Sequence, residues 1–292
     1  MIADFKTNTV YIADSTPRAY KTRLEKIGIM PKVLYGTEDY YCRDYMPVQI
    51  AEKEFVQFVY RPGEYIAKDD YKRISNPTRV ELETGLFSTL GQFKYSRIIM
   101  DGGNVVRAED KVIISDKVIE DNLLQFDNNK VAIQTELEKT LNCQVIIIPR
   151  YPRERTGHAD GLVRFIDNST VIVNMEDEND PKDWLNKFYG TFNLHNIEIK
   201  SFVTCAVKPE EMEKPKGKEN ANGLYINFLQ TCDAIVVPQF YDPKNDPIAF
   251  DQLKDAFNKS QSYSIKKMYA GDIAKYGGVL NCATWTIYQP KL

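Results

Sequence analysis

Apolar and polar positions alternate along this 292-residue chain in short blocks that predict strands and helices by turns. Residues 9–12 have the pattern of a strand, residues 16–26 that of a helix, and residues 32–35 that of a second strand. Thr16 is expected to cap the helix, and Pro17 stands at its first position, where the missing N–H costs nothing. The chain therefore begins with a strand–helix–strand unit.

Similar units follow at intervals of about sixty residues, which indicates an internal repeat. In each unit a strand ends in a polar loop, and the two strands of a hairpin follow the loop. The five predicted loops are residues 41–44, 101–104, 156–160, 205–223 and 276–282. The hairpin strands predicted after the first four loops are 47–51 with 54–60, 105–108 with 112–115, 162–166 with 170–175, and 225–228 with 234–240. A helix at 247–258 and a strand at 263–269 are predicted before the fifth loop.

One polar side chain in each loop marks the repeat. Asp44, Asn104, His158, Asn227 and Cys282 follow one another at intervals of 60, 54, 69 and 55 residues. If the units form a ring, equivalent loops meet on one axis and bring these five side chains into one pocket. The repeat thus predicts an α/β fold of five strand–helix–strand–hairpin units around a central pocket, in a single domain over residues 1–292.

One segment departs from the composition of the rest. Residues 207–222 are rich in Lys and Glu, include Pro209, Pro215 and Gly217, and hold few apolar side chains. This composition predicts a mobile surface loop. Because the segment enters the fourth loop at the expected pocket, a lid over the site is the alternative interpretation.

The overall composition narrows the class of protein. Hydrophobic residues make up 43% and charged residues 27%, which is typical of a globular chain. Charge is balanced, with 38 Lys and Arg against 41 Asp and Glu, so no basic surface for nucleic acid is expected. The longest apolar runs are too short to cross a membrane, and the first residues contain no apolar signal core. The five cysteines form no CxxC pair, which favours free thiols and a cytoplasmic protein.

Four side chains in these loops are of types that take part in catalysis. His158, one of two histidines, lies in a Gly-His-x-Asp loop, and Cys282 follows the permissive pair Gly277-Gly278. Asp44 and Asp160 add two carboxylates. Two carboxylates facing a thiol suit a planar cation, because a guanidinium donates hydrogen bonds in a fixed fork that carboxylates accept in pairs.

Two other chemistries use the same residue types. One His, one Cys and two Asp could ligate zinc, but they lack the paired spacing of known zinc sites. A cysteine protease would use Cys, His and Asn, but it leaves both carboxylates without a role. Each residue also has a structural reading, as a buried thiol, a core histidine or a turn carboxylate.

Six motifs, the third of them in two parts, form a recognisable set. They read CRDYMP at 42–47, DGGN at 101–104, PRY at 149–151 with GHAD at 157–160, YINF at 225–228, VVPQF at 236–240 and GGVLNC at 277–282. In this order they resemble the motifs of the agmatine deiminase and bacterial peptidylarginine deiminase family. That family belongs to the guanidino-modifying superfamily of five-bladed α/β propellers, the penteins, so the resemblance implies the same fold for this chain.

The resemblance also implies roles for the matching residues. Cys282 would attack the guanidinium carbon, and His158 would protonate the departing ammonia and then activate water. Asp44 and Asp160 would hold the guanidinium nitrogens. The other positions expected to bind substrate are Asn227, Asp101, Asn104 and Tyr41. A covalent thiouronium intermediate would yield a ureido product, and no metal or organic cofactor would be needed.

The chain departs from the family motifs at four places around the site. Tyr41 replaces a Trp, Met46 a Gly and Asn281 a His, and residues 283–286 replace the usual threonine–glutamine run. The expected partner is a small guanidino substrate, with agmatine favoured over peptidyl or free arginine, and a homo-oligomer is possible. An amidinotransferase and a non-catalytic guanidine-binding protein remain open. A substrate carboxylate would require an arginine, for which the candidates are Arg43, Arg107, Arg153, Arg155 and Arg164.

Overall fold

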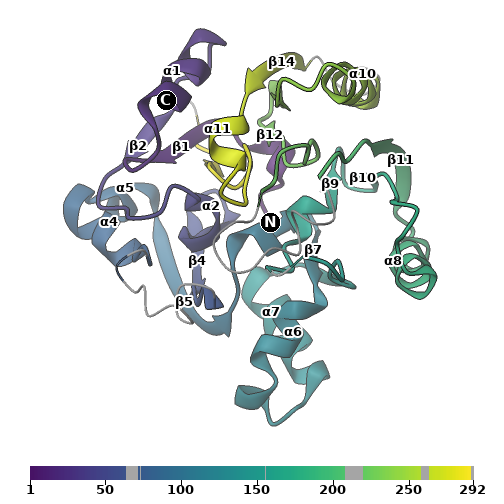
Figure 1. Cartoon of the computed structure of the whole chain (residues 1–292). Helices are drawn as coiled ribbons and strands as arrows, with labels where there is room; N and C mark the ends of the chain where they lie inside the picture. Colours follow the sequence, from purple (N-terminus) through teal and green to yellow (C-terminus); the bar gives the residue numbers. More distant parts are fainter. Residues whose placement is uncertain (64–71, 73, 155, 208–219, 258–262, 291–292) are drawn as a thin grey trace.

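The chain folds into five three-stranded sheets arranged around one axis. The computed structural model describes residues 1–63, 72, 74–154, 156–207, 220–257 and 263–290 (Figure 1). In every sheet the middle strand pairs antiparallel with one neighbour and parallel with the other. The predicted fivefold α/β propeller is therefore confirmed.

The sheets follow one another along the chain, except that the last strand of the chain belongs to the first sheet. The first sheet contains β15 (Trp285–Ile287), β1 (Thr9–Ala13) and β2 (Lys32–Leu34). The second and third contain β3 (Val48–Ala51), β4 (Glu54–Val59) and β5 (Gln92–Ile99), then β6 (Val106–Arg107), β7 (Lys111–Ser115) and β8 (Gln144–Ile148). The fourth and fifth contain β9 (Val163–Phe165), β10 (Thr170–Asn174) and β11 (Glu198–Val203), then β12 (Leu229–Gln230), β13 (Ala234–Gln239) and β14 (Ser264–Tyr269).

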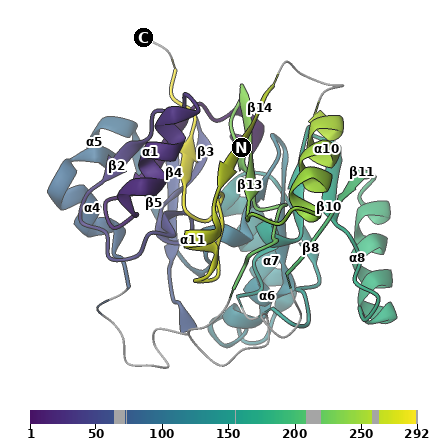
Figure 2. The same ribbon diagram turned by 45° about the horizontal axis from the view of Figure 1, so that its top comes forward.

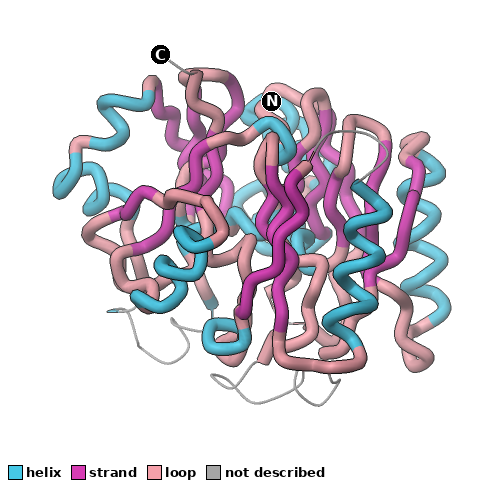
Figure 3. The backbone as a smooth tube through the Cα atoms, turned by 90° about the horizontal axis from the view of Figure 1, so that it is seen from above, coloured by secondary structure: helices cyan, strands magenta, loops and turns pink. Residues whose placement is uncertain are grey.

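Helices join the parallel strands of each sheet, as a parallel connection requires. They lie at the periphery of the ring in the axial view, and Figures 2 and 3 show them on the outer side of the strands. These helices are α1 (Arg18–Lys26), α4 (Pro77–Thr84), α5 (Leu86–Leu90), α6 (Asp116–Asn122), α7 (Lys130–Leu141), α8 (Lys182–Leu194) and α10 (Asn245–Phe257). Runs such as Val112-Ile113-Ile114 are fully buried because both faces of the sheet are covered. Val112 and Ile114 lie in one apolar cluster with α6, α7 and the strands of the second sheet, and Ile113 lies in another with α8 and the strands of the fourth sheet.

Two local predictions were wrong. Thr16 does not cap α1: the helix begins at Arg18 after Pro17, and Thr16 Oγ1 has no hydrogen-bond partner among the described residues. The backbone N–H of Thr16 instead closes a turn onto Ala13 O at 3.1 Å, which places the residue too early to act as the cap.

The strand predicted at 225–228 is a turn, and the strand is the shorter β12. Turn hydrogen bonds such as Asn227 N–H to Leu224 O, at 3.4 Å, replace sheet pairing here. Tyr225, Ile226 and Phe228 are nevertheless fully buried in the core. Complete burial produces the same apolar run in a turn as in a strand, so the pattern could not distinguish them.

Three further expectations concern the cysteines, membrane spans and the proposed surface loop or lid. All five cysteines are free thiols, as predicted. Within the described ranges no helix has both the length and the apolar character that a membrane span needs. Most of the proposed surface loop or lid, residues 208–219, lies outside the described residues.

Closure of the ring depends on Trp285 in β15. Its side chain is 3% exposed, its ring lies 5.1 Å from that of Tyr11 and 6.1 Å from that of Phe55, and its Nε1–H donates to Pro47 O at 2.7 Å. These contacts join the last strand to the first and second sheets.

We expect Trp285→Ala to lower the free energy of unfolding by about 3–5 kcal/mol, because it leaves a cavity and an unpaired carbonyl in the core. Urea unfolding followed by circular dichroism measures this loss. Leu124→Ala, at a side chain 91% exposed, is the control and should change stability by less than about 0.5 kcal/mol. Equal effects of the two substitutions would show that the Trp285 side chain does not stabilise the closed ring.

Candidate active site

The candidate residues occupy equivalent connections between neighbouring sheets. Each connection leaves the third strand of one sheet and enters the first strand of the next, so all five lie at the same end of the ring. Among the described residues, four of them contain a short helical turn: α2 (Cys42–Tyr45), η3 (Gly102–Asn104), η5 (Ala159–Gly161) and α11 (Gly271–Ala274). The pocket that the repeat predicts is thus built by the topology.

Cys282 lies in the connection that leads into β15 and is held from two neighbouring units. Its backbone N–H donates to Asn227 Oδ1 at 3.2 Å, and the N–H of Asn281 donates to Asn227 O at 3.1 Å. Its Sγ lies 3.7 Å from Asp160 Oδ2, where a protonated thiol can donate to the carboxylate. Cys282 is buried but still lines the cavity.

His158 stands between two carboxylates. Its Nε2 lies 3.2 Å from Asp101 Oδ2, and its Nδ1 lies 3.7 Å from Asp44 Oδ1. The backbone N–H of Gly103 donates to Asp44 Oδ1 at 3.0 Å. A Cβ at position 103 would lie 2.4 Å from His158 Nδ1, so the close approach of this imidazole requires glycine.

Burial and charge shift the pKa values of these groups in a consistent direction. Burial, together with Asp101 and Asp160, raises the pKa of Asp44 to about 8, although His158 opposes this change. Burial lowers the pKa of His158, but Asp44 and Asp101 outweigh it and raise that pKa well above its ordinary value. Burial, Asp160 and Asp44 raise the pKa of Cys282 well above that of a free thiol. The free site therefore holds a protonated imidazole and a neutral thiol.

A cavity of about 150 Å³ opens over Cys282. Its floor contains Cys282, His158, Asp160 and Asn227. Its outer wall combines carboxylates with aromatic rings, from Tyr151, Glu154, Glu176, Asp177, Asp180, Trp184, Phe188 and Tyr189. Of the described residues that line it, none is a lysine or an arginine.

Four of the predicted residues support the cavity from outside it. Asp44 and Asp101 lie next to the two ring nitrogens of His158, as described above. Asn104 Oδ1 accepts a hydrogen bond from the backbone N–H of Ser115 at 3.2 Å, which ties η3 to β7. Tyr41 lies under the loop that carries Cys282, where its hydroxyl accepts from Gly278 N–H at 2.9 Å and lies 2.8 Å from Ile273 O.

The acidic outer wall was not predicted from the sequence. Its signal was the run of acidic residues at 176–180, which follows β10 of the unit that carries His158. That run reads equally well as a solvated loop, so only its position over Cys282 distinguishes it.

Of the arginines considered for a substrate carboxylate, the four that the structure describes do not line the cavity. Arg43, Arg107 and Arg164 are buried behind its floor. Arg153 donates to Asn179 O at 2.7 Å, and its Nη1 lies 3.8 Å from Asp177 Oδ1 in the outer wall. Arg155 lies outside the described residues. Across the described ranges, no three His, Cys, Asp or Glu side chains converge as ligands for a metal ion.

Comparison with known proteins agrees with the fold. A protein of Shewanella sp. (strain MR-4), provisionally named an agmatine deiminase, is 27% identical over 225 residues, which are 69% of this chain and 60% of that protein. Agmatine deiminase of C. jejuni with substrate bound has a TM-score of 0.70 at 18% identity, over 99% of this chain and 96% of its own. Agmatine deiminase of Enterococcus faecalis has a TM-score of 0.74 at 16% identity, over 100% of this chain and 95% of its own.

A family model covers nearly the whole chain. The model of the Porphyromonas-type peptidyl-arginine deiminases matches residues 1–287, a range that includes all five sheets and every candidate site residue. The chain belongs to the Porphyromonas-type peptidyl-arginine deiminase family.

Proposed function

We propose that this protein is a deiminase that hydrolyses a guanidino compound to a ureido product and ammonia. The observation that carries the proposal is the position of the Cys282 sulfur, 3.7 Å from the Asp160 carboxylate on the floor of an acidic cavity that His158 also lines. A guanidinium bound by Asp160 would present its central carbon to the sulfur.

The proposed reaction begins when the Cys282 thiolate attacks the guanidinium carbon. His158, which its carboxylate neighbours keep protonated, gives a proton to the departing nitrogen, and ammonia leaves. The S-alkylthiouronium that remains is attacked by water, whose proton returns to His158. Collapse of the adduct breaks the C–S bond, releases the ureido product and restores Cys282.

Binding of the cationic substrate is proposed to ionise the nucleophile. In the free site, burial and the charges of Asp160 and Asp44 keep the pKa of Cys282 high. A guanidinium placed against Asp160 offsets that negative charge and favours the thiolate, whose proton passes to water because His158 is already protonated. Although Asp44 does not line the cavity, its charge acts at Cys282, so both carboxylates would stabilise a cation there.

The outer wall of the cavity favours agmatine over free or peptidyl arginine. Free arginine carries a carboxylate, which the carboxylates of Glu176 and Asp180 would repel. Agmatine carries an amine at that end, which these carboxylates and the ring of Trp184 can bind. Peptidyl arginine has no charge there and gains little from the acidic wall. The names of the relatives point to the same substrate, although the curated match spans 60% of the relative's length.

An amidinotransferase would use the same thiouronium but pass the amidino group to an amine instead of water. A non-catalytic guanidine-binding protein would still bind the guanidinium through its carboxylates but would not hydrolyse it. The deiminase is favoured because the relatives are named as deiminases, and His158, which lines the same cavity as Cys282, can activate water for the second step.

The function is tested by ammonia release from agmatine, free arginine, a blocked arginyl peptide and methylated arginines, with the product identified by mass. We expect agmatine to give the largest kcat/KM. Cys282→Ser should abolish turnover, because a hydroxyl is a far weaker nucleophile, while binding measured by calorimetry persists. Ammonia release by the Ser variant at the wild-type rate would disprove the thiouronium mechanism.

The ionisation of Cys282 is tested by alkylation at different pH values. Because its pKa is raised, alkylation by neutral chloroacetamide should be slow at pH 7 and should still be increasing above pH 9. Cationic chloroacetamidine should react faster at pH 7, since it brings the charge that favours the thiolate. Peptide mass mapping follows Cys282 separately from the other four thiols. A plateau below pH 8 with the neutral reagent would mean that the free thiol is already ionised.

The acidic wall is tested by the double substitution Glu176→Gln and Asp180→Asn. It should increase KM for agmatine about 10-fold, as expected for two partly exposed carboxylates that bind one amine, and should leave kcat/KM for propylguanidine unchanged. Glu178→Gln, in the same run but away from the cavity, is the matched control. An equal loss for agmatine and propylguanidine would show that the wall does not bind the amine.

A further inference from the structure

A ring of buried polar side chains surrounds the propeller axis behind the cavity floor. The second residue of each entering strand is polar, and each is at most 3% exposed. These residues are Gln49, Arg107, Arg164, Gln230 and Thr286. None of them lines the cavity, so neither the predicted site nor the proposed reaction accounts for them.

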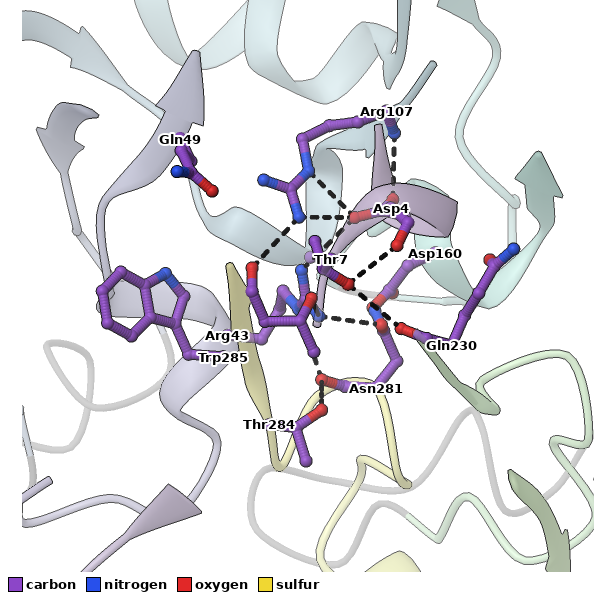
Figure 4. Close-up of polar contacts among 12 residues, drawn as sticks. Asp4, Thr7, Arg43, Gln49, Arg107, Asp160, Gln230, Asn281, Thr284 and Trp285 are labelled. Atoms are coloured by element: carbon purple, nitrogen blue, oxygen red, sulfur yellow. Dashed lines mark hydrogen bonds and ion pairs between the residues drawn. The ribbon is translucent and has the colours of Figure 1, made fainter. Parts of the chain in front are cut away.

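A carboxylate from the start of the chain fills the centre of this ring. Asp4 belongs to η1 (Asp4–Lys6) and is 4% exposed (Figure 4). Its Oδ1 accepts from Arg107 Nε at 2.9 Å and from Arg107 Nη2 at 2.6 Å, and its Oδ2 accepts from the backbone N–H of Arg107 at 3.0 Å. The same Oδ1 lies 3.8 Å from Arg43 Nη1. Asp4 thus compensates two buried guanidinium groups.

Arg43 connects this centre to the cavity floor through Asn281. Its Nη2 donates to Asn281 Oδ1 at 3.0 Å, and its Nε donates to the backbone carbonyl of Asn281 at 3.3 Å. A guanidinium can only donate hydrogen bonds, so the amide oxygen of Asn281 must face Arg43. The amide nitrogen then faces Asp160, to which it donates at 2.6 Å.

We propose that Asn281 is a positioning residue for the reaction proposed above: Arg43, paired with Asp4, fixes the amide of Asn281, which holds the Asp160 carboxylate beside Cys282. Charges alternate along this line, from Arg107 to Asp4, Arg43 and Asp160, and the guanidinium of the substrate would be the next cation. The inference rests on the proposed function, because Asp160 needs a fixed position only if it binds a cation.

The donated hydrogen bond has two consequences for Asp160. It restricts the carboxylate to one orientation, with Oδ2 shared between the amide nitrogen of Asn281 and the sulfur of Cys282. It also gives a polar partner to a carboxylate that is only 2% exposed. A carboxylate that is oriented before binding can pair with a guanidinium without reorganisation.

The test compares the alkylation of Cys282 by cationic chloroacetamidine with its alkylation by neutral chloroacetamide. The ratio of the two rate constants measures how well the site binds a planar cation, and general damage to the thiol lowers both rates together. Asn281→Leu has nearly the same shape but neither donates nor accepts. We expect it to lower this ratio, and kcat/KM for agmatine, by about 10- to 100-fold, the size of one hydrogen bond to a charged group.

Two further substitutions distinguish the contact of Asn281 with Arg43 from its contact with Asp160. Thr286→Val removes the other side-chain acceptor of Arg43 Nη2, which lies at 3.1 Å, and leaves Asp160 untouched. It should cost similar stability but keep the wild-type ratio. Asn281→His keeps an N–H donor at about the same position but loses the acceptor for Arg43, so its ratio should lie between those of the wild type and Asn281→Leu.

The outcomes decide between the inference and the function on which it rests. If Asn281→Leu does not fold, Arg43→Lys replaces it, because an ammonium lacks the fork that fixes the amide and should lower the ratio in the same way. A wild-type ratio in a folded Asn281→Leu or Arg43→Lys protein overturns the positioning role while agmatine turnover stands. If the wild-type protein neither prefers the cation nor releases ammonia, the proposed function fails and the inference fails with it.

Discussion

A carboxylate buried among arginines holds the centre of this propeller together. Burying the guanidinium groups of Arg43 and Arg107 without a counter-ion would cost several kcal/mol each, and Asp4 offsets that cost with two short hydrogen bonds to Arg107 and a longer ion pair to Arg43. Because Arg43 belongs to α2, Arg107 to β6 and Asp4 to η1, this pairing fixes three separate segments around one axis. The cavity floor is built directly on top of it.

The same burial controls the reactivity that we propose for the site. Removal from water raises the pKa of Cys282, so the free thiol is neutral and shielded from adventitious reaction. The carboxylates that raise this pKa are also the groups that would attract a guanidinium. A site of this kind becomes nucleophilic when its cation arrives, which makes substrate selection and activation one electrostatic event.

Much of the fold could be predicted because each repeated unit shows a similar local pattern of apolar and polar residues. In strand β8, for example, every residue after Gln144 is apolar. The strands of the hairpin after His158 begin and end within one residue of their predicted bounds. One failure was local and the other came from tertiary packing. Thr16 closes a turn onto Ala13 O, three residues earlier, and residues 225–228 are apolar because the core surrounds them, although they form no strand.

The sequence by itself determined the five units, the order of the motifs and the residue types that meet at the axis, since these depend on local spacing. It could not say that Asn104 accepts from a backbone N–H or that Asp44 and Asp101 lie next to the two ring nitrogens of His158. Nor could it say that the acidic run at 176–180 lines the cavity over Cys282. Only the tertiary structure decided those points, because distances between units depend on how the sheets pack.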